Sequence, residues 1–418
     1  MSDTNTAHLP KPASKTGRQN WTVIAFGFLA LSLAFSGRAA LGLIMPVWQS
    51  EFGWSGSYIS GVGATALVVM AAIAPFAGRL VDRRGPQFTL NLGLGLLGVG
   101  CAIVALMNGK AMFVIGFAGF CAFGFGIVAT HVVATAVTRS FSVNQGLATG
   151  IATSGATGGQ FLIVPLIAAL LAFASWRWSF GALALTSLAL IPCIRMSLRA
   201  DAPCEAVREQ DPAPSGMTKD VALILRRPAF HLLFWSFLIC GFTTTGVIET
   251  HLLPFASFCG FPPIPSATAY GVLSLVNLVG MIVAGWLSDR VNRPMLLAAI
   301  YLMRALTFIL LGNLPGTSVE MLFVFAILFG AVDYATVPVT ASLVASHVGI
   351  RVMGLAMGMI SAGHAIGGAM GAFLGGFVFD LGGGYGILWT GSLWLAVGAG
   401  VLVLFLTAQP TSRPVTQT

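Results

Sequence analysis

The chain has 418 residues, of which 56% are hydrophobic and only 8% are charged. A soluble protein uses about 25% charged residues to cover its surface, so the composition excludes a soluble enzyme or a set of soluble domains. The net charge of +8 does not indicate nucleic-acid binding, because long apolar stretches separate the basic residues instead of leaving one basic patch. The chain is therefore predicted to be an integral membrane protein that crosses the bilayer many times.

Apolar runs of roughly 20 residues, enough to cross a hydrocarbon core of about 30 Å, recur along nearly the whole chain. We expect an all-α integral membrane fold of twelve transmembrane helices: 21–46, 57–80, 88–107, 111–137, 146–173, 176–197, 229–256, 266–287, 295–314, 320–344, 352–378 and 385–407. A polar, proline-containing stretch separates the sixth helix from the seventh. The predicted organisation is a tail (1–20), an N-terminal six-helix bundle (21–197), a linker (198–228), a C-terminal six-helix bundle (229–407) and a second tail (408–418).

The positive charges set the expected orientation. If the spans alternate across the bilayer, all Lys and Arg residues fall on one side except Lys110 and Arg177, which fall on the other, and Arg38 and Arg304, which lie within spans. Positive loops stay in the cytoplasm, so both tails and the linker are predicted to be cytoplasmic. The first 20 residues have no short apolar core with a cleavage site, and this favours a tail over a signal peptide.

The two predicted bundles repeat each other in sequence. The segment Gly78–Arg83 after the second helix recurs as Gly285–Arg290 after the eighth, and Gly146–Gly150 recurs at nearly the same spacing as Gly354–Gly358. Duplicated six-helix halves are an architecture of membrane transporters. In each half an aspartate ends a span and an arginine follows it, a pattern suited to pairing with charges or helix ends across a closing seam. The alternative is that these arginines only set the topology.

The sequence GRLVDRRGP, which starts at Gly78, resembles the signature of the major facilitator superfamily between helices 2 and 3. The copy that starts at Gly285 resembles its weaker counterpart, and with the twelve spans the resemblance covers essentially the whole chain. It implies two six-helix bundles around a central cavity, transport by alternating access, and a gating motif made of Gly78, Asp82, Arg83, Asp289 and Arg290.

Shorter motifs are similar to the bacterial monocarboxylate-porter-like branch of that superfamily. Porters of this branch carry a substrate-binding arginine in helix 8, but residues 266–287 contain no basic residue, so Arg38 of helix 1 would have to supply the charge for a carboxylate. The motifs that carry this resemblance are FSGRAALGL from Phe35, EFGWS from Glu51, GFTTTG from Gly241, THLLP from Thr250, DYATVP from Asp333 and GHAIG from Gly363.

Arg38 is the first candidate for a functional residue, because a charge at the bilayer centre costs about 2.5–3.5 kcal/mol and is tolerated when it faces a partner or a watery cavity. A guanidinium fits a carboxylate with two parallel hydrogen bonds, and we hypothesise that Arg38 binds the anionic head of a substrate. The alternative is a structural ion pair with Glu249 or Asp333. The predicted substrate-binding set is Arg38, Thr245, His251, Asn277, Tyr334 and His364.

Proton coupling needs a group that changes its charge near physiological pH, and buried carboxylates and histidines meet that need. Asp333 and Glu249 are the predicted coupling residues, with Asp333 preferred because it lies mid-span beside Tyr334. For the histidines, His131 above all, the alternative is an interhelical hydrogen bond. Arg304 is interpreted as a snorkelling residue or a structural partner of Asp333.

The leading hypothesis is a secondary transporter of a small organic anion, similar to a monocarboxylate, that works by proton symport as a monomer in a bacterial inner membrane. The alternatives are an efflux carrier for amphiphilic compounds such as drugs or siderophores, and a sensor built on a transporter scaffold. The sequence has no metal-ligand spacing, no nucleotide-binding motif and no nucleophile paired with a base, so we expect no enzyme activity and no cofactor.

Overall fold

The computed structural model describes residues 16–141, 143–197 and 216–406, and all regular structure in these ranges is helical. Most of the predicted N-terminal tail, the first part of the predicted linker and the C-terminal tail lie outside the described residues. The N-terminal bundle contains α1 (Thr16–Phe52), α2 (Gly56–Ala105), α3 (Lys110–Phe113), η1 (Val114–Cys121), α4 (Ala122–Ile127), α5 (Thr130–Ser140), α6 (Gln145–Thr153), α7 (Gly155–Phe173) and α8 (Trp176–Ser197).

The C-terminal bundle repeats this order of helices. The linker contributes one short helix, α10 (Met217–Leu225). The bundle that follows contains α11 (Pro228–Gly241), η2 (Phe242–Ile248), α12 (Glu249–Phe258), α13 (Pro263–Ser288), α14 (Arg293–Gly312), α15 (Val319–Val332), α16 (Thr336–His347), η3 (Ile350–Val352), α17 (Met353–Val378), η4 (Phe379–Gly383) and α18 (Gly384–Leu404).

Within the described residues, eleven helical segments are long and apolar enough to cross a membrane. The longest, α2, has 50 residues and contains a backbone break at Gly85, where φ is 78°. This left-handed conformation is available to glycine without steric cost, so two spans meet there instead of one helix continuing. The eleven segments, with two spans in α2, account for the twelve predicted spans, and the predicted all-α membrane fold is confirmed.

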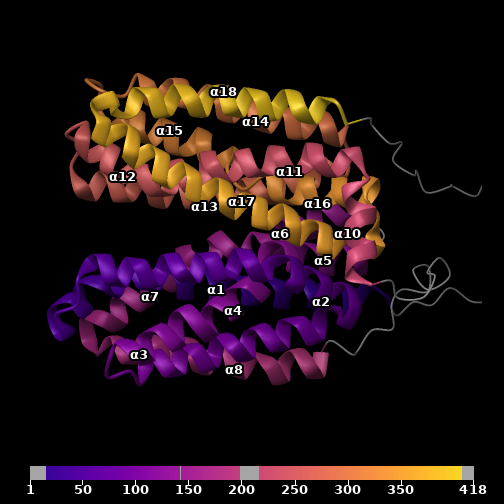
Figure 1. Cartoon of the computed structure of the whole chain (residues 1–418), viewed down its shortest axis with the longest axis horizontal. Coiled ribbons are helices and arrows are strands. Elements are labelled where there is room, and N and C mark those ends of the chain that lie inside the picture. Colours follow the sequence, from indigo (N-terminus) through magenta and orange to yellow (C-terminus); the bar gives the residue numbers. More distant parts are fainter. Residues whose placement is uncertain (1–15, 142, 198–215, 407–418) are drawn as a thin grey trace, which may run out of the picture.

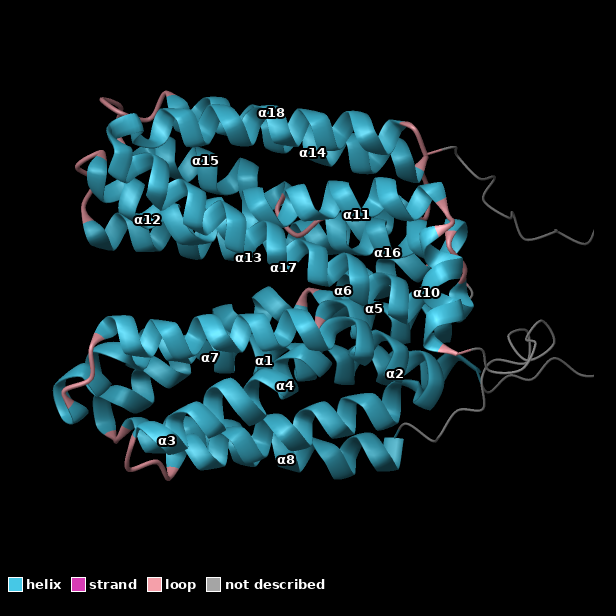
Figure 2. Cartoon of the chain, viewed as in Figure 1, coloured by secondary structure: helices cyan, strands magenta, loops and turns pink. Residues whose placement is uncertain are grey.

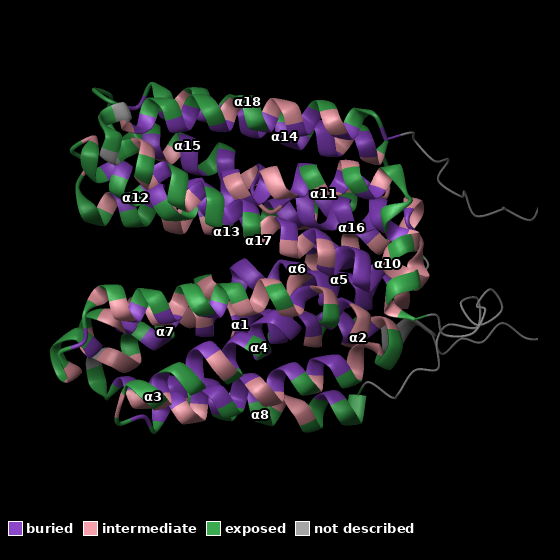
Figure 3. Cartoon of the chain, in the orientation of Figure 1, coloured by how far each residue is buried: buried purple, intermediate pink, exposed green. Residues whose placement is uncertain are grey.

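The two bundles lie side by side and meet at one end. Figures 1 and 2 show their ribbons converging where α5, α6, α10 and α16 lie, and standing apart where α3 and α12 lie. We call the first the linker end and the second the far end. Figure 3 shows buried residues inside each bundle and where the bundles meet. Large apolar side chains such as Phe173 and Met196 are exposed, as expected of surfaces that face lipid.

Glycines bring the backbones of the two bundles into contact at the linker end. A Cβ atom added to Gly78 of α2 would lie 1.9 Å from the carbonyl oxygen of Gly354 in α17. A Cβ atom added to Gly285 of α13 would lie 2.3 Å from the carbonyl oxygen of Gly146 in α6. No other residue type permits this approach, so the repeated glycine segments of the sequence are the surfaces on which the bundles join.

Three differences between the structure and the sequence prediction bear on the candidate site. The end of the predicted linker forms a helix, α10. Predicted helix 4 breaks at Val128–Ala129, between α4 and α5, and predicted helix 10 breaks after Val332, between α15 and α16. These two breaks occupy corresponding positions in the repeated halves. Interrupted helices in corresponding positions are typical of the binding sites of transporters.

The glycine contact gives a first prediction. Replacement of Gly354 by leucine should lower the stability of the purified protein, because its side chain has no room beside Gly78 and Asp82; overpacking costs about 1–3 kcal/mol or more. Gly376→Leu in the same helix is the control, because a Cβ atom there meets nothing within 4 Å. Thermal unfolding in detergent measures both, and equal midpoints would contradict the packing account.

Candidate functional site: closing contacts and a broken helix

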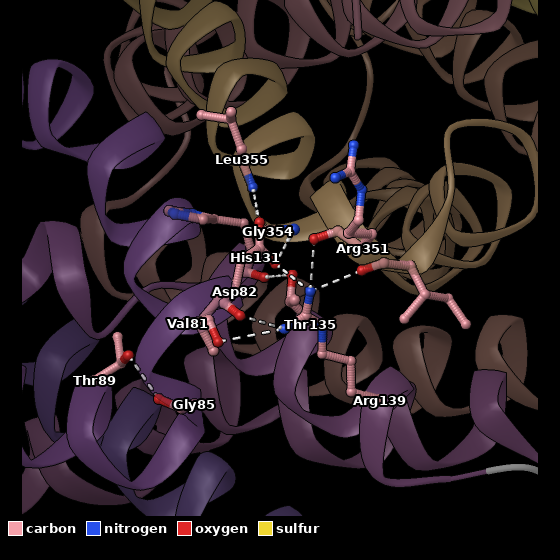
Figure 4. A network of polar contacts seen from close by, with 11 residues as sticks. Val81, Asp82, Gly85, Thr89, His131, Thr135, Arg139, Arg351, Gly354 and Leu355 are labelled. Atoms are coloured by element: carbon pink, nitrogen blue, oxygen red, sulfur yellow. Dashed lines mark hydrogen bonds and ion pairs between the residues drawn. The ribbon is translucent and has the colours of Figure 1, made fainter. Parts of the chain in front are cut away.

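Asp82 of α2 caps the start of α17 in the opposite bundle. Its Oδ1 accepts a hydrogen bond from the backbone N–H of Gly354 (2.9 Å), and its Oδ2 accepts one from Leu355 (2.9 Å). The first N–H groups of a helix have no partner within the helix and carry the positive end of its dipole, so a carboxylate binds there with both hydrogen bonds and charge. Figure 4 shows this contact between the two bundles.

Arg139, the last basic residue of α5, reinforces the Asp82 cap. Its Nη2 lies 2.6 Å from Asp82 Oδ1 and also donates to the carbonyl oxygens of Ile350 (2.7 Å) and Arg351 (3.0 Å) (Figure 4). One guanidinium thus binds both the carboxylate of its own bundle and the backbone that precedes α17. Sequence reasoning missed Arg139, although a basic residue in the last turn of a span was a visible signal.

Asp289 makes the same cap in the opposite direction. At the end of α13, its Oδ1 accepts from the N–H of Gly146 (2.8 Å) and its Oδ2 accepts from Leu147 (2.9 Å), at the start of α6. The arginines that follow the two aspartates, Arg83 and Arg290, are both exposed, and Arg290 donates to the carbonyl oxygen of Trp286 in the last turn of α13. The aspartates and glycines of the predicted motif thus make direct contacts across the seam.

The linker helix α10 adds a further contact at the linker end. Asp220 lies 3.1 Å from Arg79 of the N-terminal bundle and 3.8 Å from Arg351 of the C-terminal bundle, measured between oxygen and nitrogen atoms. Both Arg79 and Asp220 are largely buried. The linker therefore joins the two bundles in the chain and also makes ion pairs with both of them.

Asn277 holds the break between α15 and α16. Its Nδ2 donates to Asp333 Oδ2 (3.0 Å), and its Oδ1 accepts from the backbone N–H of Tyr334 (3.1 Å). Asn277 and Asp333 are both nearly fully buried. The amide thus satisfies the first residues after α15, where the helical hydrogen bonds stop, and it fixes the carboxylate of Asp333 in the interior.

Arg304 approaches the same break from α14. Its side chain is completely buried, and Nη2 donates to the carbonyl oxygens of Val332 (2.9 Å) and Asp333. Its Nη1 contacts Cys240 Sγ (3.0 Å) and Thr243 Oγ1 (3.4 Å). The residue does not snorkel to a membrane surface, because all these partners lie inside the bundle.

Arg38 lies half-buried in α1, with its guanidinium 4.4 Å from the ring centre of Phe35. Among the described residues, no carboxylate oxygen lies within 4.0 Å of its guanidinium, so the alternative ion pair with Glu249 or Asp333 is not formed in this conformation.

Tyr334 and Glu249 connect the broken helix to the start of α12. The hydroxyl of Tyr334 donates to Glu249 Oε1 (2.8 Å), and Glu249 is exposed. The bond thus joins a hydroxyl just after the helix break to a carboxylate of α12. Sequence reasoning missed Tyr270, a half-buried phenol in α13.

The histidines bind helix backbones or ring neighbours. His251 Nε2 lies 3.1 Å from the carbonyl oxygen of Ala372, and His131 Nε2 lies 3.1 Å from that of Ala74. His364 packs 5.0 Å from Phe237 between ring centres, and Thr245 lies half-buried in the π-helical segment η2. The described residues contain no group of three or more His, Cys, Asp or Glu side chains suited to a metal ion.

The sequence comparisons decide the family. The family model of the Major Facilitator Superfamily matches residues 27–319 and 284–418. The chain belongs to the Major Facilitator Superfamily. Its relatives include monocarboxylate transporter 13 of Bos taurus, 25% identical over 404 residues that cover 95% of this chain and 93% of the relative. They also include monocarboxylate transporter 11 of Homo sapiens, 27% identical over 79% of this chain and 69% of the relative.

A bacterial relative and two solved structures agree with this family. An MFS-type transporter of Bacillus subtilis is 25% identical over 81% of this chain and 83% of its own length. The E. coli fucose:proton symporter superposes with a TM-score of 0.71 at 17% identity, covering 93% of this chain and 99% of the symporter. The human organic anion transporter MFSD10 gives 0.69 at 20% identity, covering 92% and 99%. This superfamily member is therefore a multi-pass membrane transporter and not an enzyme.

The two aspartate caps give a second prediction. Asp82→Asn should speed hydrogen exchange of the Gly354 and Leu355 amides by about ten- to a hundredfold, because a hydrogen bond to a charged group contributes about 1.5–3 kcal/mol. Exchange measured by mass spectrometry on peptides from the start of α17 reports this. Asp289→Asn is the matched control and should affect the start of α6 instead. If each variant changed both peptides equally, the caps would not be the local contacts described.

Proposed function

We propose that this superfamily member carries a small organic anion, similar to a monocarboxylate, together with a proton, by alternating access. The observation that carries the proposal is Arg38, a charge within a span that has no carboxylate within 4.0 Å among the described residues. A guanidinium left without an ion pair in a poorly hydrated region is suited to bind a carboxylate from outside the protein. The names of the monocarboxylate transporter relatives support the same substrate class.

The residues of the proposed substrate site have complementary roles. Arg38 binds the carboxylate, and the phenols of Tyr270 and Tyr334 are hydrogen-bond donors for the rest of a small substrate. Tyr334 is bonded to Glu249 in the present conformation, so an entering anion would compete for that hydroxyl. Thr245, Asn277, His251 and His364 stay in the proposed substrate set, with Asn277 acting through Asp333 and Tyr334, and His251 and His364 through the packing of α12 and α17.

Asp333 is the proposed proton carrier, with Glu249 as the second titrating group. Asp333 is buried at a helix break, directly before Tyr334, which we assign to the substrate site. A carboxylate in such a place is neutral or charged depending on its neighbours, so the charge of the site changes with the bound anion. Proton binding at Asp333 would offset the negative charge that the substrate brings in.

Alternating access would use the contacts at the linker end. In the present conformation the two aspartate caps hold the bundles together there, while Glu249 at the other side of the site is exposed. The linker end would open when these contacts separate. The proposed gating residues are Gly78, Asp82 and Asp289, together with the neighbouring Arg83 and Arg290. We place the linker and both tails in the cytoplasm of a bacterium, with the chain acting as a monomer in the inner membrane.

Arg38→Gln should lower the uptake of labelled monocarboxylate into proteoliposomes by about tenfold or more, because the charged fork is lost; each 1.4 kcal/mol is a factor of ten. Arg38→Lys keeps the positive charge but lacks the planar fork, so its uptake rate should lie between those of the wild type and Arg38→Gln. Arg177→Gln, which removes an exposed arginine paired with Glu51, is the control and should transport normally. Wild-type uptake by a correctly inserted Arg38→Gln carrier would reject Arg38 as the anion anchor.

Asp333→Asn should abolish acidification of the vesicle lumen during anion uptake but keep anion exchange, because the substrate site remains while the proton carrier is lost. A pH-sensitive dye in the lumen measures the first, and counterflow of labelled substrate measures the second. Glu320→Gln, a fully exposed carboxylate in the same helix as Val332, is the control. Acidification at the wild-type rate in Asp333→Asn vesicles would contradict the assignment.

A further inference from the structure

The break after α15 leaves a negatively polarised helix end inside the C-terminal bundle. The last carbonyl groups of a helix have no N–H partner within the helix and carry the negative end of its dipole. At this end they belong to Val332 and Asp333, and both residues are nearly fully buried. In transporters with interrupted helices, carbonyl groups of this kind coordinate the coupling cation.

The Arg304 guanidinium occupies this position. Nη2 binds the carbonyl oxygens of both Val332 and Asp333, and Nη1 reaches the hydroxyl of Thr243 in η2. Two backbone carbonyls, a hydroxyl and a nearby carboxylate form the kind of oxygen-rich set that hard cations prefer. The positive group among these oxygen atoms is the guanidinium of Arg304, a residue of α14 whose side chain lies inside the bundle.

The charge balance agrees with a fixed cation at this site. A buried guanidinium is costly unless its charge and donors are compensated. No carboxylate oxygen lies within 4.0 Å of Arg304 among the described residues, so the compensation comes from the helix end, from Cys240 Sγ at 3.0 Å and from the more distant charge of Asp333. A direct ion pair with Asp333 would have tied the carboxylate to Arg304; the present arrangement leaves it bonded to Asn277.

We propose that Arg304 is a tethered cation that takes the place of a coupling metal ion at the break between α15 and α16. The carrier then needs no Na⁺ at this site, because the positive charge is part of the chain and stays through the transport cycle. The only charge that changes there is the one on Asp333. This inference builds on the proposed coupling role of Asp333, but its test uses neither substrate nor transport.

The test is the thermal unfolding of purified Arg304→Ala in sodium chloride, in choline chloride of equal ionic strength, and in choline chloride with millimolar methylguanidinium. The wild-type midpoint should be the same in all three. Arg304→Ala should unfold at a lower temperature in choline, and sodium or methylguanidinium should raise its midpoint by several degrees, because ligands that bind the folded state stabilise it. The double variant Arg304→Ala/Asp333→Asn should respond less, since a nearby negative charge is lost.

Arg177→Ala controls for the loss of an arginine outside the site and should show no cation response. If Arg304→Ala cannot be purified folded, Arg304→Lys and Arg304→Met replace it: the lysine variant should be stable and indifferent to sodium, and the methionine variant should be less stable and sodium-dependent. A methionine variant as stable as the lysine variant, or an alanine variant that responds to neither cation, would overturn the proposal. Neither result would bear on anion uptake, which the Arg38 variants test separately.

Discussion

The structure depends on one reciprocal interaction: an aspartate at the end of a span in each bundle caps the first turn of a helix in the other. The cap is strong because two backbone N–H groups and the helix dipole act on one carboxylate. It forms because Gly78 and Gly285 let the backbones touch, so that Asp82 and Asp289 reach across. The repeated sequence segments are thus the two halves of a contact, since the aspartate segment of each bundle binds the glycine segment of the other.

The contact made by Asp82 has more polar partners than the contact made by Asp289. Asp82 has a second partner in Arg139, which also binds the backbone before α17, and the linker helix adds Asp220 between Arg79 and Arg351. Asp289 has the cap alone among the contacts that the described residues show. In the proposed cycle we expect the contact between α13 and α6, which has fewer polar partners, to separate first.

Much of the fold could be predicted from the sequence, because span length and internal repeats each leave a direct trace. Asp82 and Asp289 could be identified as important because they occupy the same position in the two repeated segments. Hydropathy reports burial but not whether a helix is continuous, so the break after Val332 was hidden in an unbroken apolar pattern. The helix α10 was not predicted, because the sequence of the linker indicated only a polar connection between the bundles.

The partners in the site were harder to predict, since they are far apart in the sequence. Arg139 and Ile350 meet across the two bundles, and Arg304 meets Val332 through the interior of one. The sequence showed that Arg304 is a charged residue within a span. It did not show its partners, because these are backbone carbonyl groups at the helix break, and backbone groups are the same whatever the residue type. For Arg38 the sequence left an ion pair and a substrate site open; the conformation described has no such pair and leaves the proposed anion site available.

The central claim is that the linker end and the far end open in alternation around one site. The most direct test is the distance between spin labels on exposed positions, Val143 and Val291 at the linker end and Phe173 and Ile264 at the far end, with and without anion at acidic pH. The account predicts that substrate lengthens the first distance while it shortens the second. If both distances stay constant during transport, or change in the same direction, the bundles do not exchange contacts as proposed.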